Sequence, residues 1–92
     1  RGLLPNKKGR QTLLKEIAEM KRTVVLFEST HRIIKLLSEL ETVSINRNIC
    51  IARELTKVHE EVICGTSAEL RAQLEDEPVK QKGEFVVIIR PQ

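Results

Sequence analysis

Two runs rich in β-branched residues constrain the fold of this chain more than any other feature of its sequence. Residues 23–27 read Thr-Val-Val-Leu-Phe, and residues 84–90 read Glu-Phe-Val-Val-Ile-Ile-Arg. Such side chains favour extended backbone, and a run without polar alternation is typical of a strand that is covered on both faces. We therefore expect a sheet in which residues 23–27 form a central strand.

Helical patterns separate the predicted strands. The apolar positions with helical spacing are Leu13, Ile17 and Met20, then Ile33, Leu37 and Leu40, then Leu70 and Leu74. Thr66 and Glu69 match a capping box at the start of the third helix, and Pro78 is expected to end it. Two further strands are predicted at residues 49–52 and 62–64. The order α, β, α, β, β, α, β indicates an α/β fold, a mixed sheet flanked by helices on its faces.

Length and composition indicate one folded domain, residues 1–92, with 40% hydrophobic and 32% charged residues. No apolar run approaches the roughly 20 residues that span a bilayer, and no secretory signal is evident. We therefore expect a cytoplasmic protein that does not bind membranes. Cys50 and Cys64 are expected to be reduced and buried, and their spacing relative to His31 and His59 does not indicate a metal site.

The positive charge is concentrated in the first part of the chain. Residues 1–22 carry seven basic and two acidic side chains, a charge of +5 in a chain whose total is +3. A basic arm of this kind can neutralise nucleic-acid phosphates without reading sequence. The alternative is that these cations only keep an exposed helix soluble, and this stays open because only two Phe are present to stack on bases.

Two polar segments follow predicted strands, residues 28–32 and the charged loop expected at residues 53–61. If both strands run in the same direction, these segments meet at one edge of the sheet, where α/β proteins place binding groups. The alternative is structural, with Glu28 pairing with Arg32 and Arg53 with Glu54 to fix the loops. Glycine-rich phosphate loops and a nucleophile elbow are absent from the sequence, so nucleoside triphosphatase and hydrolase functions are not indicated. Nucleic-acid binding and half of an active site both remain open.

Several blocks of sequence carry a family resemblance. They are residues 4–10, 27–32 and 52–61, and the pairs Gly65-Thr66 and Gly83-Glu84. In order and spacing they resemble the carboxy-terminal half of those tetrapyrrole methylase superfamily enzymes that methylate small-subunit ribosomal RNA. Phe27 and Thr30 stand where this family commonly has Tyr and Pro, so the chain departs from the pattern in a hydrogen-bonding group and in a rigid start to the helix.

The resemblance implies the carboxy-terminal domain of a two-domain, class III methyltransferase. Such an enzyme transfers a methyl group from S-adenosylmethionine to the 2′-hydroxyl of a cytidine in ribosomal RNA and usually forms a homodimer. Its cofactor lies in a cleft between the two domains, so residues 1–92 alone are expected to be inactive. The open alternatives are a non-catalytic RNA-binding or dimerisation domain, and a relative that methylates a tetrapyrrole or another small molecule.

The resemblance also suggests roles for individual residues. The expected cofactor contacts are Phe27, Glu28, Ser29, Ala52, Arg53, Ile89 and Arg90. The candidates for handling the hydroxyl proton are Lys57, His59 and Glu60, without a choice of one general base. The candidate RNA contacts are Lys7, Lys8, Arg10 and Arg32. No metal ligand is expected.

Overall fold

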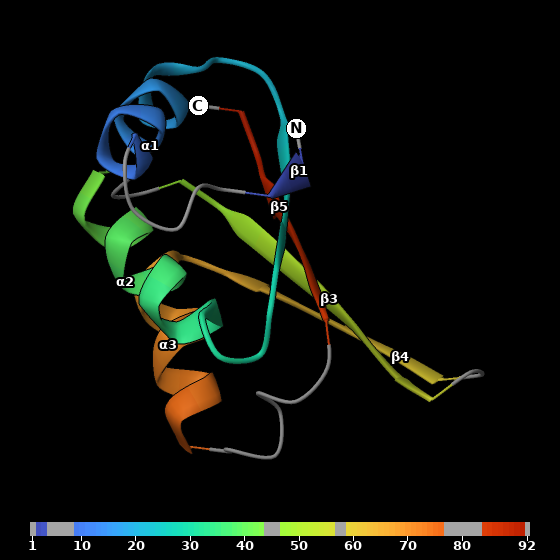
Figure 1. Cartoon of the computed structure of the whole chain (residues 1–92). Helices are drawn as coiled ribbons and strands as arrows, with labels where there is room; N and C mark the ends of the chain where they lie inside the picture. Colours follow the sequence, from blue (N-terminus) through green and yellow to red (C-terminus); the bar gives the residue numbers. More distant parts are fainter. Residues whose placement is uncertain (1, 4–8, 44–46, 57–58, 77–83, 92) are drawn as a thin grey trace.

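A computed structural model describes residues 2–3, 9–43, 47–56, 59–76 and 84–91 (Figure 1). The elements in chain order are β1 (Gly2–Leu3), α1 (Arg10–Glu19), β2 (Val24–Glu28), α2 (Ile33–Val43), β3 (Ile49–Thr56), β4 (His59–Gly65), α3 (Ser67–Asp76) and β5 (Phe85–Ile89). The predicted order is confirmed from α1 onward. β1 was not predicted, because a strand of two residues has no detectable pattern.

The five strands form one mixed sheet in the order β1-β2-β5-β3-β4. β1 runs parallel to β2, and the other neighbouring strands are antiparallel. The predicted α/β fold with a mixed sheet is therefore confirmed. β2 lies inside the sheet between β1 and β5, whereas the middle strand is β5, whose sequence Phe-Val-Val-Ile-Ile is the most strongly β-forming in the chain.

One face of the sheet carries the core. α1, α2 and α3 all lie on the same side of the strands (Figure 1), and alternate strand residues point toward them. The sheet side of this core consists of Val24, Leu26, Ile49, Ile51, Phe85, Val87 and Ile89, each at most 3% exposed. Full burial of one such side chain contributes about 1.5–3 kcal/mol. The described helices thus cover one face only, and the expectation of helices on both faces is corrected for this part of the chain.

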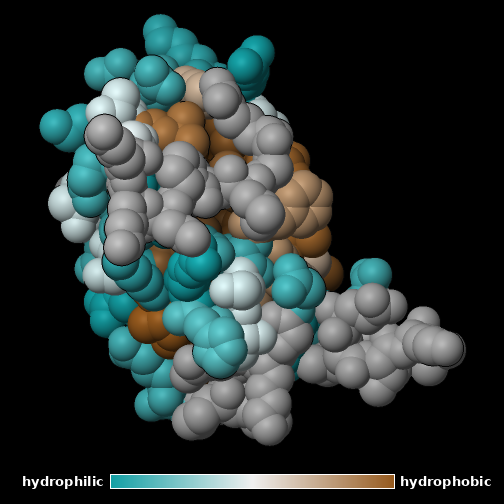
Figure 2. Space-filling view, viewed as in Figure 1, coloured by the Kyte–Doolittle hydropathy of each residue, from teal (hydrophilic) through white to brown (hydrophobic). Residues whose placement is uncertain are grey.

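The opposite side of the sheet, which we call the open face, is also apolar. Its residues are Val25, Phe27, Cys50, Ala52, Val62, Cys64, Val86 and Ile88, which stand next to one another in the strand registers. Phe27 is 44% and Val62 59% exposed. Hydrophobic atoms reach the surface on the sheet side, at the right of Figure 2, whereas the helix side is mostly hydrophilic. The apolar runs in the sequence therefore reflect two apolar faces, of which the described helices cover one.

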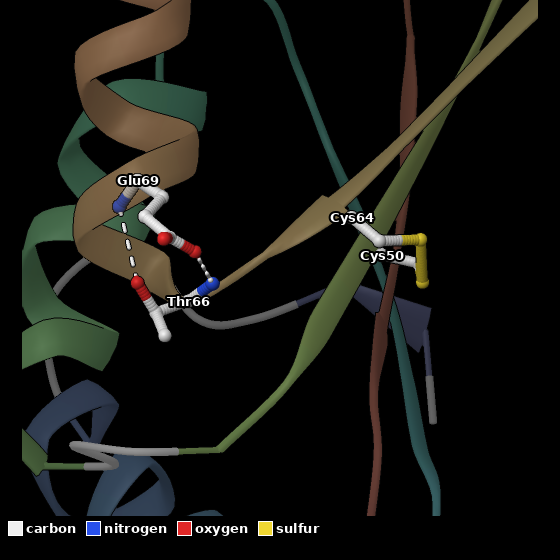
Figure 3. The surroundings of a disulfide bond; sticks show 4 residues. All are labelled: Cys50, Cys64, Thr66 and Glu69. Carbon is white, nitrogen blue, oxygen red and sulfur yellow. Dashed lines mark hydrogen bonds between the residues drawn. A yellow bond between two sulfur atoms is a disulfide. The ribbon is translucent and has the colours of Figure 1, made fainter.

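Cys50 and Cys64 form a disulfide, so the expectation of reduced, buried thiols is wrong (Figure 3). The two residues are directly opposite each other in the β3–β4 register, with their Cα atoms 4.1 Å apart. Cys64 is exposed and Cys50 is half-buried. The sequence argument relied on compartment and spacing, and neither reveals a strand register that aligns two thiols.

The capping box at the start of α3 is confirmed (Figure 3). The Thr66 backbone N–H donates to Glu69 Oε1 at 2.8 Å, and the Glu69 N–H donates to Thr66 Oγ1 at 3.2 Å. A Cβ at Gly65 would lie 2.8 Å from the same Glu69 oxygen, so glycine leaves room for this carboxylate. The cap contributes about 1 kcal/mol. Pro78, predicted to end the helix, lies outside the described residues.

The described part of the charged segment, residues 53–56 and 59–61, forms two paired strands and not the predicted loop. β3 continues to Thr56 and β4 begins at His59, with Arg53 opposite Glu61 and Glu54 opposite Glu60. β5 pairs with β3 only as far as Arg53, so the two strands project beyond the rest of the sheet (Figure 1). We call this part, residues 54–56 and 59–60, the projecting hairpin. A strand that has left the sheet core tolerates charged side chains, which is why polarity alone misidentified it as a loop.

Candidate functional site

The carboxyl ends of β2 and β3 lie at the same edge of the sheet. Both strands are antiparallel to β5, which lies between them, so they are parallel to each other. Glu28 at the end of β2 and Arg53 in β3 both stand opposite Phe85. Two strand spacings put their backbones about 10 Å apart. The condition set for the two polar segments to meet at one edge is therefore fulfilled.

Arg53 is held on the covered face of the sheet. Its side chain is 5% exposed, and its Nη2 lies 3.3 Å from Glu61 Oε1 across the β3–β4 ladder. Its Cζ lies 5.8 Å from the centre of the Phe85 ring on the other neighbouring strand. A guanidinium over an aromatic face is attracted by the ring quadrupole, and the carboxylate balances its charge. Arg53 thus contacts side chains of both strands that flank β3.

Glu28 is buried among groups from three elements. Its side chain is 4% exposed, its Oε1 accepts a hydrogen bond from the Ser29 N–H at 3.0 Å, and its Oε2 lies 3.7 Å from Arg10 Nη2. Arg10 also donates to Glu39 of α2, at 2.7 Å from Nη2 and 3.0 Å from Nε. The hydrogen bond with Glu39 is the largest cause that raises the pKa of Arg10 above its ordinary value, and Glu28 adds to it. The cluster links β2, α1 and α2.

Ion pairs that fix the strand ends are present at this edge, as one of the two sequence interpretations predicted. Their partners, however, differ from those predicted. Glu28 contacts Arg10 instead of Arg32, and Arg53 contacts Glu61. The side chain of Glu54, the predicted partner of Arg53, lies outside the described residues. The two clusters fix the ends of β2 and β3 to neighbouring elements, which is the structural role that the alternative predicted.

The predicted cofactor residues are distributed over two faces and two edges. Phe27 and Ala52 lie on the open face, whereas Glu28 and Arg53 lie on the covered face. Ser29 follows β2 and is half-buried. These five residues share one edge of the sheet.

Ile89 and Arg90 lie at the opposite edge. Ile89 stands opposite Val24 and Ile49, at the amino ends of β2 and β3, about 13 Å along β5 from Phe85. Its side chain is 0% exposed, and the Arg90 side chain is exposed. The structure does not bring these two residues together with the other cofactor candidates.

Two of the predicted catalytic residues, His59 and Glu60, belong to the projecting hairpin. Glu60 in β4 is exposed and stands on the side of the open face, because its neighbour Glu61 points to the covered face. His59 is the first residue of β4, and its side chain lies outside the described residues, as does all of Lys57. These assignments stay predictions. The backbone places Glu60 and His59 beyond the edge at which Glu28 and Arg53 lie.

The predicted RNA contacts differ in accessibility. Lys7 and Lys8 lie outside the described residues. Arg32 is half-buried in the turn that precedes α2. Arg10 is 4% exposed and engaged with two carboxylates, so an RNA phosphate would have to displace these contacts. The basic residues around Arg10 in the sequence suggested a surface cation, whereas its side chain is buried in ion pairs.

Arg47 is a buried residue that the sequence did not single out. Its guanidinium donates to the Arg90 carbonyl oxygen at 2.7 and 3.1 Å and to the Ile17 carbonyl oxygen at 2.8 Å. It thereby satisfies backbone acceptors at the ends of β5 and α1. Nothing in the local pattern Asn-Arg-Asn distinguishes it from a surface cation.

Two kinds of site are not found in the described part of the chain. No group of three or more His, Cys, Asp and Glu side chains there is placed to hold a metal ion. No helix in the same residues has the length and apolar character needed to cross a bilayer.

Comparison with known proteins gives a consistent set of relatives, although no protein-family model matches the chain. Over 96% of its length the chain is 42% identical to Ribosomal RNA small subunit methyltransferase I of Pasteurella multocida and also 42% identical to the protein of that name from Borrelia garinii. It is 40% identical over 97% of its length to the one from Xylella fastidiosa. The chain spans 32%, 40% and 33% of these relatives, respectively. The resemblance seen in the sequence motifs is thus confirmed. Over nearly its whole length, the chain matches one segment of proteins in the ribosomal RNA small subunit methyltransferase I family.

Proposed function

We propose that this chain is the carboxy-terminal domain of an enzyme that methylates the 2′-hydroxyl of a cytidine in small-subunit ribosomal RNA, with S-adenosylmethionine as methyl donor. The observation that carries the proposal is the similarity, at 42% identity over 96% of the chain, to proteins named as methyltransferases of that RNA. The shared edge of the two polar strand ends supports it, because binding groups in α/β folds gather at such edges.

Methyl transfer to a hydroxyl demands little covalent chemistry from the protein. The ribose oxygen must approach the methyl group in line with the departing sulfur, and a nearby base must accept the hydroxyl proton. Glu60 and His59 in the projecting hairpin are our candidates for the base, and Lys57, which lies outside the described residues, is the third. Arg32, with Lys7 and Lys8, would contact phosphates. Arg10 is the weakest RNA candidate because its charge is balanced inside the fold.

The cofactor would lie at the edge formed by the ends of β2 and β3. Phe27, Ser29 and Ala52 are accessible there and could contact the cofactor directly. Glu28 and Arg53 are buried on the covered face and would support these contacts. Ile89 and Arg90 would contact the cofactor only if it extended to the opposite edge of the sheet. S-Adenosylmethionine supplies the electrophilic methyl group, and this chain would contribute one wall of its site.

The rest of the site would come from the remainder of the protein. The chain spans 32–40% of its relatives, and an open sheet edge does not enclose a ligand from all sides. Small-molecule sites generally bury most of the ligand surface. We therefore expect the isolated chain to lack both cofactor affinity and transferase activity, and the whole protein to be a cytoplasmic homodimer that acts on the ribosomal subunit.

Calorimetric titration tests this proposal. S-Adenosylmethionine is titrated into the isolated chain and into the full-length protein, and methyl transfer from labelled cofactor to small ribosomal subunits is measured for both. Binding and 2′-O-methylation by the full-length protein alone are expected. Transfer by the isolated chain would overturn the shared site, and transfer by neither would overturn the enzymatic assignment.

A second function from a different class is favoured by the open face. Exposed apolar side chains such as Phe27 and Val62 are typical of interaction surfaces, so a non-catalytic dimerisation or RNA-binding role is the alternative. RNA binding by the full-length protein without methyl transfer would support it.

A further inference from the structure

The projecting hairpin leaves the sheet at one defined position. β5 begins at Phe85, which stands opposite Arg53, so beyond Arg53 strand β3 has only β4 as a described partner. An isolated pair of strands is only marginally stable in water. The direction of the projecting hairpin relative to the sheet therefore depends on contacts at its foot, where Arg53 and Glu61 face each other.

The side chains at the foot of the hairpin connect three strands. Arg53 of β3 lies over the ring of Phe85 in β5 and pairs with Glu61 of β4, at 5.8 and 3.3 Å respectively. Phe85 is 2% exposed, so the ring provides a rigid support inside the core. The Cys50–Cys64 disulfide joins β3 to β4 on the open face but does not involve β5. Within the described residues, Arg53 is thus the side chain that ties the hairpin to the central strand.

We propose that Arg53 is a positioning residue, which with Glu61 clamps the foot of the hairpin onto Phe85 and so sets the orientation of Glu60 toward the substrate. This rests on the proposed function and changes the role assigned to Arg53 from cofactor contact to support of the hairpin. The planar guanidinium suits the task, because it can stack on the ring and bond the carboxylate at once, whereas a lysine ammonium provides only a point charge.

The position of Glu60 next to Glu61 lets the clamp act on one of the candidate proton acceptors. They are consecutive strand residues, so their side chains point to opposite faces. Holding the Glu61 carboxylate against Arg53 on the covered face fixes the backbone from which Glu60 projects on the other face. A small reorientation of a proton acceptor is enough to lower the rate of methyl transfer while leaving ground-state binding intact.

The first test is a kinetic comparison in the full-length protein. The variants are Arg53→Met, Arg53→Lys and Glu61→Gln, with Arg71→Met as matched control because Arg71 pairs with Glu41 away from this edge. We expect kcat to fall about 100-fold in Arg53→Met and Glu61→Gln, with the cofactor Kd within about threefold of wild type. Arg53→Lys should recover part of the loss, and the control should retain wild-type kcat. A cofactor Kd weakened tenfold or more by Arg53→Met, with Glu61→Gln unaffected, would overturn the proposal and restore direct cofactor contact.

A second measurement separates this proposal from the proposed function. Amide hydrogen exchange of residues 59–61 is followed in the same proteins and should accelerate in Arg53→Met and Glu61→Gln but not in Arg71→Met. This result is independent of activity, so it holds even if wild type transfers no methyl group, an outcome that would sink the proposed function alone. Unchanged exchange in both clamp variants, in folded proteins, would overturn the clamp.

Discussion

The two faces of the sheet are built from neighbouring residues of the same strands, yet they are stabilised in different ways. On the covered face, fully buried aliphatic side chains meet three helices, and buried charges are paired at one edge. On the open face, apolar side chains stay partly exposed and a disulfide joins two strands. A shift of one residue along a strand therefore exchanges core packing for surface. The comparison teaches that a strand's hydrophobicity indicates how apolar its two faces are, but not what covers them.

The largest difference is expected for the buried charges. Arg10→Met removes the cation beside Glu28 and Glu39 and leaves a buried carboxylate without its counter-charge, which costs about 3–5 kcal/mol of unfolding free energy. Urea unfolding of the isolated chain measures it. Arg71→Met, which breaks a pair whose side chains are 31% and 40% exposed, serves as control and should change the unfolding free energy much less. Equal losses of stability in the two variants would show that Arg10 contributes no more to stability than the Arg71 ion pair does.

The two isoleucines at the end of β5 give the most direct comparison of the faces. Ile89 is 0% exposed on the covered face, and Ile88 is half-buried on the open face. We expect Ile89→Ala to lower the unfolding free energy by about 3 kcal/mol, because it leaves a cavity in the core, and Ile88→Ala to lower it by less than half of that. Both values come from urea unfolding monitored by circular dichroism. Similar losses would mean that the open face is as well packed as the core.

Reduction of the disulfide should have a smaller effect. The bond closes a loop with a sequence separation of 14, for which the chain-entropy argument gives at most about 3 kcal/mol. The pairing of β3 with β4 already restricts this loop, so we expect a smaller loss. Unfolding with and without reductant measures it, and the double variant Cys50→Ser with Cys64→Ser is the control that should not respond to reductant. A response of the control would trace the effect to something other than this bond.

Local signals made part of the molecule predictable. The capping box at Thr66 and Glu69 depends on residues three apart, and strand β5 on an uninterrupted β-forming run, so both elements could be identified directly. That β5 and not β2 is the middle strand could not. The convergence of two polar strand ends followed once strand direction was assumed. Non-local contacts could not be found in this way. The partner of Arg10 lies 29 residues away, and the Cys50–Cys64 bond requires a register that sequence patterns do not specify.

The prediction of a charged loop was wrong for a related reason. Glu54 and Glu60 lie past Arg53, the last residue of β3 that pairs with β5, and where β5 begins is fixed by the whole sheet. The same dependence hid the roles of Arg10, Arg47 and Arg53. Each is a basic residue in an ordinary polar context whose burial follows from elements far away in the sequence. The polar composition predicted that two segments meet at one edge of the sheet, and the strand directions confirm it. It could not show which of the charged side chains there form ion pairs inside the fold.

The smallest effect on stability is expected on the open face, and it is the one that tests what this face is for. Val62 is 59% exposed, so Val62→Thr keeps the β-branched shape and should change the unfolding free energy by less than about 0.5 kcal/mol. If the open face associates with another surface, the same change should weaken that association, which sedimentation of the isolated chain at increasing concentration detects. Leu70→Thr, which changes a fully buried residue, is the contrasting control. It should lower the unfolding free energy clearly without a specific effect on association. A clear loss of stability in Val62→Thr without any change in association would show that this residue packs within its own domain, and the distinction between the two faces would then be one of degree.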